Sequence, residues 1–369
     1  MHATSALAEA DRLMTVCNSC RYCEGICAVF PAMEMRRAFT DGDLNYLANL
    51  CHNCSACYYD CQFSPPHEFN VNVPATLAQV RAESYEAYVW PKFLAPMFHR
   101  NGLAISLVTS LSVTVFILGF AAFKDAGVLF GTHTGPGAFY KLMPHNTMAA
   151  LFGVASLYAL IAIAMGIRNF WRDIGEPVGT LVQGSSLWQA IKDASTLRYL
   201  DGGGVGCMNE NEKPTDNRRL YHHLTFYGFM LCFAATSTAT GYHYLFSIEA
   251  PYPWYDLPVV LGTLGGIGLI IGPIGLLRAK SVRDGKLVDR RTYGMDVAFL
   301  VMLLLTSVTG LLLLVLRATP AMGMLLALHM GVVFALFITM PYGKFVHGFY
   351  RFLALVRYAK ERRDMAGGH

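Results

Sequence analysis

Eight of the ten cysteines form two runs with one shared spacing, C-x2-C-x2-C-x3-C, near the start of the chain. The first run is Cys17, Cys20, Cys23 and Cys27, and the second is Cys51, Cys54, Cys57 and Cys61. Three thiolates at two-residue spacing let one tight loop wrap a corner of an iron–sulfur cubane, while the fourth cysteine points away into the next helix or turn. The spacing therefore predicts two [4Fe–4S] clusters.

The fourth cysteine of each run decides how the clusters are shared. In ferredoxins with two clusters, this thiolate binds the cluster of the other run. We therefore expect one cluster on Cys17, Cys20, Cys23 and Cys61, and the other on Cys51, Cys54, Cys57 and Cys27. Pro31 and Pro65 repeat at the same offset as the cysteines, which indicates a duplicated unit. A proline usually follows the fourth cysteine directly, whereas Ala28 and Gln62 stand there in this chain, so the match is looser than usual.

Zinc is the main alternative for these cysteines. Structural zinc sites more naturally use two separated C-x2-C pairs than three cysteines at consecutive spacing, which favours iron–sulfur clusters. A further alternative is that only one of the two clusters is a cubane. Cysteines packed into residues 17–61 of a cytoplasmic segment favour metal ligation over disulfides. Cys207 and Cys232 stand alone and are interpreted as ordinary buried thiols.

Histidines in the apolar part of the chain form a second group that could bind a cofactor. His222 and His243 are 21 residues apart, which places them about 60° apart around a helix and about 32 Å apart along it. His329 and His347 are 18 residues apart, or five full turns of one helix, and about 27 Å apart. Two bis-histidine b-type haems would fit between such helices, an inner one on His222 and His347 and an outer one on His243 and His329.

Several alternatives to this histidine assignment stay open. His223 is the rival of His222, but its spacing to His243 turns it about 160° away. One haem is as compatible with the pattern as two, and histidines at helix ends are also common interfacial residues. His99 and His145 are spare candidates for haem ligation or quinone contact, and His52 and His67 are expected to tune or pack against the clusters. Gly228, Gly241 and Gly331 serve either close approach of a macrocycle or tight helix packing.

The elements that must position these residues are mainly helical. The chain has 369 residues, of which 54% are hydrophobic and 15% charged, too apolar for an ordinary soluble protein. From residue 101 onward, six apolar runs can each cross the ~30 Å hydrocarbon core of a bilayer. The runs are 101–123, 145–167, 222–247, 257–277, 294–316 and 320–342. We expect a ferredoxin-like helical domain binding two clusters over residues 1–96, and a cytochrome b-like domain of six transmembrane helices over residues 97–369.

The first domain carries its own helix signals. Helices are predicted over 5–16, 43–50 and 74–88. Ser5 and Asn72 are the expected N-caps, and Pro74 suits a first helical turn. These helices would frame the two cysteine runs.

The distribution of basic residues predicts the orientation in the membrane. The start of the chain lacks a basic region followed by an apolar run, so no signal sequence is expected and the N-terminus should stay in the cytoplasm. The segments then placed inside hold 26 Lys and Arg residues, against three in the outer loops. The inner segments are 1–100, 168–219, 278–291 and 344–369, so both termini and the long loop 168–219 are expected in the cytoplasm, with the chain in the inner membrane. The net charge of +4 is too small to indicate nucleic-acid binding.

Taken together, these motifs give the chain a family resemblance. Two ferredoxin-type cysteine runs precede Arg219-Leu-Tyr-His222-His223 at the opening of a helix, followed by His329-Met-Gly, Pro341 and His347. The whole chain resembles the tricarballylate (citrate) utilization protein B family. Its C-terminal half is also similar to the cytochrome b subunits of membrane nitrate reductases, in which the other two ligands lie ten residues apart on one helix. Position 232 is a cysteine here, so the second of those ligands is missing.

The resemblance implies a redox partner. It implies a soluble FAD-dependent dehydrogenase that oxidises tricarballylate or a related tricarboxylate, whose electrons this chain, as an oxidoreductase component, passes to membrane quinone. The sequence has no Gly-x-Gly-x-x-Gly after a strand and no P-loop, so we expect no flavin or nucleotide of its own, and the glycine-rich stretch 201–207 is interpreted as a flexible turn against the cluster domain. A tricarboxylate permease with an attached iron–sulfur redox sensor is the alternative. It is disfavoured because the helix interiors have almost no Lys or Arg to bind carboxylates.

Overall fold

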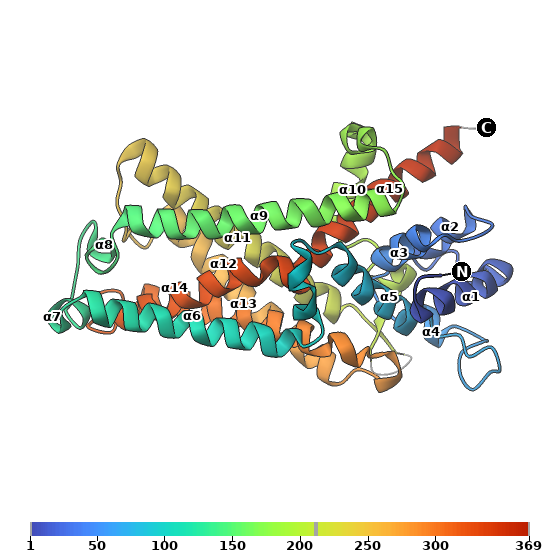
Figure 1. Cartoon of the computed structure of the whole chain (residues 1–369), viewed down its shortest axis with the longest axis horizontal. Helices are drawn as coiled ribbons and strands as arrows, with labels where there is room; N and C mark the ends of the chain where they lie inside the picture. The colour runs from blue at the N-terminus through green and yellow to red at the C-terminus, as the bar shows by residue number, and fades with distance from the viewer. Residues whose placement is uncertain (1, 210–212, 368–369) are drawn as a thin grey trace.

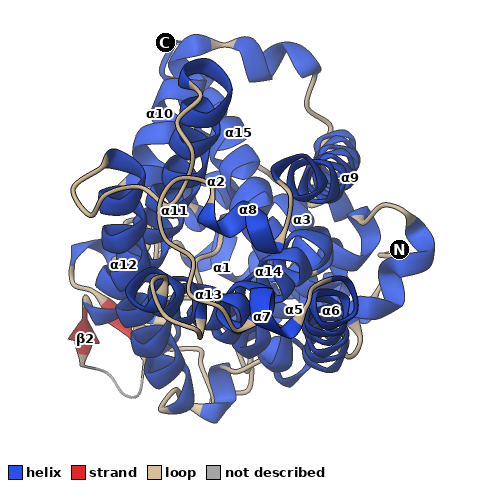
Figure 2. Cartoon of the chain, turned by 90° about the vertical axis from the view of Figure 1, so that its left-hand side faces the viewer, coloured by secondary structure: helices blue, strands red, loops and turns tan. Residues whose placement is uncertain are grey.

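The computed structural model describes residues 2–209 and 213–367, and these are almost entirely helical. Long helices lie side by side along one end of an elongated molecule, and shorter helices gather at the other end (Figure 1). Figure 2 views the molecule from the end with α7 and α8, so that several long helices are seen end-on, down their axes. A helical head and a helical bundle are therefore joined end to end.

The head contains the cysteine runs. Its first helices are α1 (Ser5–Cys20), α2 (Val29–Glu34), α3 (Asp41–Leu50), α4 (Ala56–Tyr59) and α5 (Val73–Tyr88). The predicted helices 5–16, 43–50 and 74–88 are confirmed as α1, α3 and α5. Asn72 caps α5 by accepting a hydrogen bond from the backbone N–H of Ala75, with Pro74 in the first turn, as predicted. The prediction for Ser5 is wrong by one residue, because the hydroxyl of Thr4 caps α1.

The C-terminal helix, α15 (His347–Gly367), packs against the helices of the head and is therefore part of it. Leu353 and Val356 of α15 are buried in one hydrophobic core with Leu13 of α1 and Leu47 of α3. The same helix packs against α10 (Gly184–Ser195), which lies in the loop 168–219. The head is thus assembled from three separate parts of the sequence rather than from residues 1–96 alone.

An ionic cluster fixes α15 to the N-terminal helices. Asp43, at the start of α3, accepts from Arg36 at 2.8 Å and from Arg357 of α15 at 3.0 Å. Glu361 bonds to both of the same arginines. Burial alone would raise the pKa of Asp43, but hydrogen bonds from Arg36 and Thr40 hold it below its ordinary value. These half-buried pairs stabilise the contact between the first and last helices of the head.

Five described helices are long and apolar enough to cross a membrane. They are α6 (Asn101–Phe123), α9 (His145–Asp173), α12 (Leu257–Ser281), α13 (Arg290–Leu316) and the segment Met322–Tyr342, which begins with α14 (Met322–Thr339). The sixth predicted run forms α11 (Asn217–Phe246), a helix of 30 residues. Hydroxyl-bearing and aromatic residues lower its hydropathy, and it is not one of the five. The count of six spans is therefore not confirmed.

Helix α11 packs along α12 through glycines. A Cβ atom built on Gly228 of α11 would lie 2.9 Å from the carbonyl oxygen of Gly265, and one built on Gly265 would lie 2.8 Å from the backbone nitrogen of Cys232. In the same way, a Cβ atom built on Gly331 of α14 would lie 2.6 Å from the Cα atom of Val113 on α6. Small residues allow membrane helices to approach this closely. Tight helix packing is therefore the role of Gly228 and Gly331, while Gly241 has nothing within 4 Å of such a Cβ.

The last apolar run does not continue as one helix to His347. Pro341 lies in the 3-10 turn η5 (Met340–Tyr342), Gly343 is extended with φ −148° and ψ −162°, and a second turn, η6 (Lys344–Val346), precedes α15. Proline disfavours helical geometry at the residue before it and removes a backbone donor. The prediction that His329 and His347 share one helix at five-turn spacing is therefore wrong, because the chain breaks between them.

Short elements complete the described chain. The helical ones are η1 (Lys92–Phe98), α7 (Ala126–Leu129), α8 (Ala138–Leu142), η2 (Val178–Val182), η3 (Gly202–Gly204) and η4 (Gly285–Leu287). In the described residues one antiparallel pair of strands, β1 (Cys207–Met208) and β2 (Pro214–Thr215), aligns Cys207 with Thr215. This pair lies just before α11 and closes the long inner loop.

Candidate functional site

The first cysteine cavity lies between the end of α1 and the turn after α4. Four cysteines line it, namely Cys17, Cys20, Cys23 and Cys61. Phe30 and Phe63 contribute apolar walls, and the side-chain amide of Gln62 lies 4.0 Å from the sulfur of Cys20. The chain turns sharply after Cys20 because Arg21 adopts a left-handed conformation with φ 56°. Three cysteines of the first run thus meet the last cysteine of the second.

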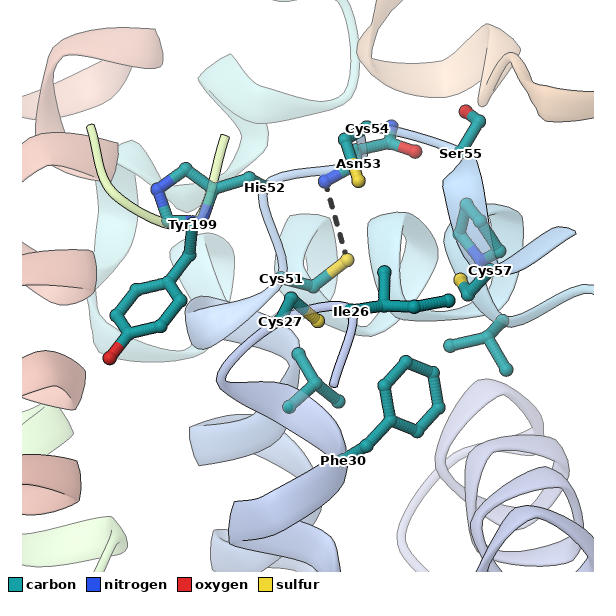
Figure 3. A pocket seen from close by; sticks show the side chains of 13 residues that line it. Ile26, Cys27, Phe30, Cys51, His52, Asn53, Cys54, Ser55, Cys57 and Tyr199 are labelled. Carbon is teal, nitrogen blue, oxygen red and sulfur yellow. Dashed lines mark hydrogen bonds between the residues drawn. The ribbon is translucent and has the colours of Figure 1, made fainter. Parts of the chain in front are cut away.

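The second cysteine cavity lies beside the loop from α3 to α4. Its four cysteines are Cys27, Cys51, Cys54 and Cys57, and Figure 3 shows their side chains around one space. Asn53 and Ser55 have φ of 55° and 70°, which lets the loop curl around that space. The backbone N–H of Asn53 lies 3.4 Å from the sulfur of Cys51, within hydrogen-bond reach. Three cysteines of the second run thus meet Cys27, the last cysteine of the first run.

The donor set of each cavity fits a cubane. Four thiols face each space, and the two sets are those that exchanged fourth ligands predict. In residues 2–209 and 213–367 no three His, Cys, Asp or Glu side chains converge as a single metal ion requires. A cubane offers one iron to each thiolate and so holds its ligands farther apart than one ion does. Ligation by these residues stays a prediction.

Burial raises the pKa of six of the eight cavity cysteines. Burial, with repulsion from neighbouring cysteines, raises the pKa of Cys17 and of Cys23 to about 12. Burial likewise raises the pKa of Cys54 to about 12 and that of Cys27 well above its ordinary value. Metal ligands must be deprotonated, so assembly of a cluster would release protons from both cavities.

The two cavities differ in their exposure. Tyr22 in the first cavity is 72% exposed, and all four of its cysteines are half-buried. In the second cavity Cys51 and Cys54 are buried. A glycine-rich turn covers it: a Cβ on Gly202 would lie 3.2 Å from Ala56, and one on Gly203 would lie 3.2 Å from the backbone of Ile26. The turn thus lies against both cysteine runs, and the first cavity is the one that faces solvent.

The structure brings His222 and His347 together at the head end of the bundle. Their ring centres are 6.2 Å apart and their planes are inclined by 78°. Two imidazoles on opposite faces of one iron have ring centres roughly 6 Å apart, given metal–nitrogen bonds of about 2 Å. The Nδ1 atom of His347 is hydrogen-bonded to the carbonyl oxygen of Lys344, as is usual for a histidine whose other ring nitrogen binds a metal. The pair fits a haem iron, and its role as ligands stays a prediction.

The outer histidines have other partners. His243 stacks on His145, with ring centres 3.5 Å apart and planes inclined by 20°. His329 instead accepts or donates a hydrogen bond at 2.9 Å with Thr309 of α13 and packs against Gly310. Stacked rings at 3.5 Å are too close to bind opposite faces of one iron. His243 and His329 thus make separate contacts, and an outer haem between them stays a prediction.

The remaining histidines have contacts that fit non-ligand roles. The ring of His223 lies against Tyr227 rather than towards His347. His52 is buried beside Cys51, with Nδ1 3.0 Å from the carbonyl oxygen of Leu50. The other two pack or pair in the head: His67 lies against Phe63 and Phe69, and His99 against Glu86.

Sequence reasoning missed the contacts between arginines and the segment Ala48–Ser55, which is the end of α3 and the loop after it. Arg218 lies one turn before His222 and donates to the carbonyl oxygens of His52 and Asn53. Arg351 lies one turn after His347 and donates to the carbonyl oxygen of Cys51 at 2.7 Å. The positive-inside pattern predicts arginines at this end of the helices, but it does not say which of them make specific contacts. Their acceptors are backbone carbonyls from another part of the chain, which carry no sequence signal. Both histidine helices are thereby bound to the second cysteine loop.

Comparison with known proteins agrees with this organisation. Residues 96–368 match the family model for citrate utilization protein B, and residues 10–87 match the model for the Fer4-like domain of that protein. The chain is 50% identical over 361 residues to citrate utilization protein B of Escherichia coli, covering 98% of this chain and 94% of that protein. No solved structure matches it. With both its cysteine head and its apolar bundle accounted for, the chain belongs to the citrate utilization protein B family.

Proposed function

We propose that the chain is a membrane-bound electron-transfer protein of a tricarballylate or citrate utilization system. When bound, two [4Fe–4S] clusters and b-type haem supply one-electron chemistry between a reduced FAD-containing dehydrogenase and the quinone pool. The head holds the clusters through its two sets of four cysteines, and His222 and His347 hold the haem. The chain thereby acts as the oxidoreductase component between a soluble flavoprotein and the membrane.

One observation carries this proposal: the second cysteine cavity adjoins the inner histidine pair. Arg218 and Arg351 each lie one helical turn from a histidine of that pair and donate hydrogen bonds to the loop that contains Cys51. The more exposed first cavity offers an entry for electrons, and the more buried second cavity is the one that contacts α11 and α15. This order of sites is the one that an electron path from solvent to membrane requires.

The proposed topology has six crossings. Five helices are apolar enough to span a membrane, and α11 would be the sixth, covered on one side by α12. The excess of Lys and Arg at the head end supports a topology with the head and both termini in the cytoplasm and the chain in the inner membrane. The head would then face a cytoplasmic dehydrogenase.

We expect the purified chain to support quinone reduction by a reduced FAD-dependent tricarballylate-type dehydrogenase. The assay follows quinol formation with the chain in detergent or lipid, and the dehydrogenase alone is the control. Vesicles that contain only the chain should take up no labelled tricarboxylate. Uptake into such vesicles without any quinone reduction would instead support the permease.

A further inference from the structure

Four arginines surround the segment Ala48–Ser55, the end of α3 and the loop after it, which carries two cysteines of the second cavity. We name them the arginine group: Arg81, Arg218, Arg283 and Arg351. They come from α5, from α11, from the segment after α12 and from α15, so four distant parts of the sequence converge on one loop. Each donates at least two hydrogen bonds to it.

The contacts of the arginine group are made almost entirely with backbone oxygens. Arg81 donates to the carbonyl oxygens of Ala48, at 3.0 Å, and Cys51, at 2.7 Å. Arg283 donates to the carbonyl oxygen of Asn53 at 3.0 Å, to its side-chain oxygen at 2.8 Å and to the hydroxyl of Ser55 at 2.7 Å. Because the acceptors are neutral, the four positive charges remain uncancelled beside the cavity.

Carboxylates do not neutralise this group in the part of the chain that the structure describes. Fifteen ion pairs join described residues, and none includes a member of the arginine group. The Nε atom of Arg283 is in addition buried without a hydrogen-bond partner. Burial, with repulsion from Arg218, lowers the pKa of Arg283 to about 10, so this side chain is still charged at neutral pH. The second cavity is therefore strongly electropositive.

The first cavity has fewer positive neighbours. Among the described residues neither cavity is lined by arginine or lysine, but the backbone of the first run accepts from one arginine, Arg21, at the carbonyl oxygen of Asn18. Asp60 is in addition close enough to add to the raised pKa of Cys23. Its cysteines are also nearer to solvent. A cluster gains one negative charge on reduction, so positive neighbours raise its reduction potential and negative ones lower it.

We propose that the arginine group gives the cluster of the second cavity a higher reduction potential than the cluster of the first. With both clusters bound, this difference would favour the transfer of one electron from the first cluster, which would be oxidised, to the second, which would be reduced beside His222 and His347. The four side chains act by position and charge, and none binds iron. This inference rests on the proposed function, because it takes both clusters as present.

The test is a redox titration of the full-length chain in detergent, followed by electron paramagnetic resonance of each reduced cluster. The signal that persists in Cys61→Ser, which disrupts the first cavity, identifies the second cluster. In the wild type, we expect the second cluster to be reduced at the higher potential. Arg283→Gln should shift its oxidised-to-reduced ratio by about tenfold at fixed potential, or about 59 mV downward, and leave the first cluster unchanged.

Matched variants separate charge from folding. Arg283→Lys should keep most of the wild-type potential, and Asn53→Asp, which retains an oxygen for Arg283 but adds a negative charge, should lower it. Arg317→Gln is the control, since Arg317 also donates to a backbone carbonyl, that of Tyr252, at the outer end of α13. Equal shifts in Arg283→Gln and Arg317→Gln, an unshifted Asn53→Asp, or a second cluster with the lower potential would overturn the inference. Absence of both clusters would instead overturn the proposed function.

Discussion

Replacing Cys61 with serine is expected to destroy the cluster of the first cysteine run and leave that of the second run in place. Cys61 belongs to the second run in sequence, but it lines the cavity of Cys17, Cys20 and Cys23. Loss of one of four thiolates leaves an iron of that cubane without its ligand. Cluster iron and acid-labile sulfide should fall to about half of the wild-type content, with the electron paramagnetic resonance signal of one cluster lost.

The reciprocal variant and a neutral one control this prediction. Cys27→Ser should remove the cluster of the second cavity, because Cys27 lies there with Cys51, Cys54 and Cys57. Cys232→Ser should retain both clusters, since Cys232 lies on α11 within the bundle. Damage by Cys61→Ser that is confined to the cluster of Cys51–Cys57 would refute the exchange of fourth ligands.

Replacing either His222 or His347 with alanine is expected to abolish the absorbance band of the reduced inner b-type haem. Their ring centres are 6.2 Å apart in a T-shaped arrangement, so each variant would remove one of the two residues proposed to hold the haem. Loss should be complete rather than partial if the haem needs both histidines. Reduced-minus-oxidised spectra of purified chain, scaled to protein, measure it.

His223 provides the matched control for His222. It is the next residue on α11 but contacts Tyr227, so His223→Ala should keep the haem band. If His222→Ala and His347→Ala both kept full haem, the inner site would have to lie elsewhere. The same spectra of His243→Ala and His329→Ala test for a second haem. These two residues make different contacts in the structure, so neither variant should change the band of the inner haem.

Local patterns predicted most of the fold and the membership of each cysteine cavity. The helix Asn101–Phe123 was predicted at its observed bounds because an uninterrupted apolar run between polar residues leaves few alternatives. The exchanged cysteines were predictable because their spacing restricts which thiols one loop can present. The helix is determined within a few turns of chain, whereas the exchange joins two runs and was predictable from the general behaviour of this spacing in two-cluster ferredoxins.

Features that depend on contacts between distant segments could not be predicted in this way. Pro341 and Gly343 break the last apolar run, which a count of residues between His329 and His347 cannot reveal. The stacking of His243 on His145 depends on how α9 and α11 meet at the end of the bundle away from the head. The arginine group is likewise invisible in the sequence, because its acceptors are backbone oxygens that carry no residue signature.

The iron and acid-labile sulfide content of the purified full-length chain tests the central claim most directly. Two [4Fe–4S] clusters require about eight irons per chain besides haem iron, with about eight labile sulfides. We predict that result, with no stoichiometric zinc. Two zinc ions per chain without labile sulfide would contradict the account, because the two sets of four cysteines would then be structural zinc sites.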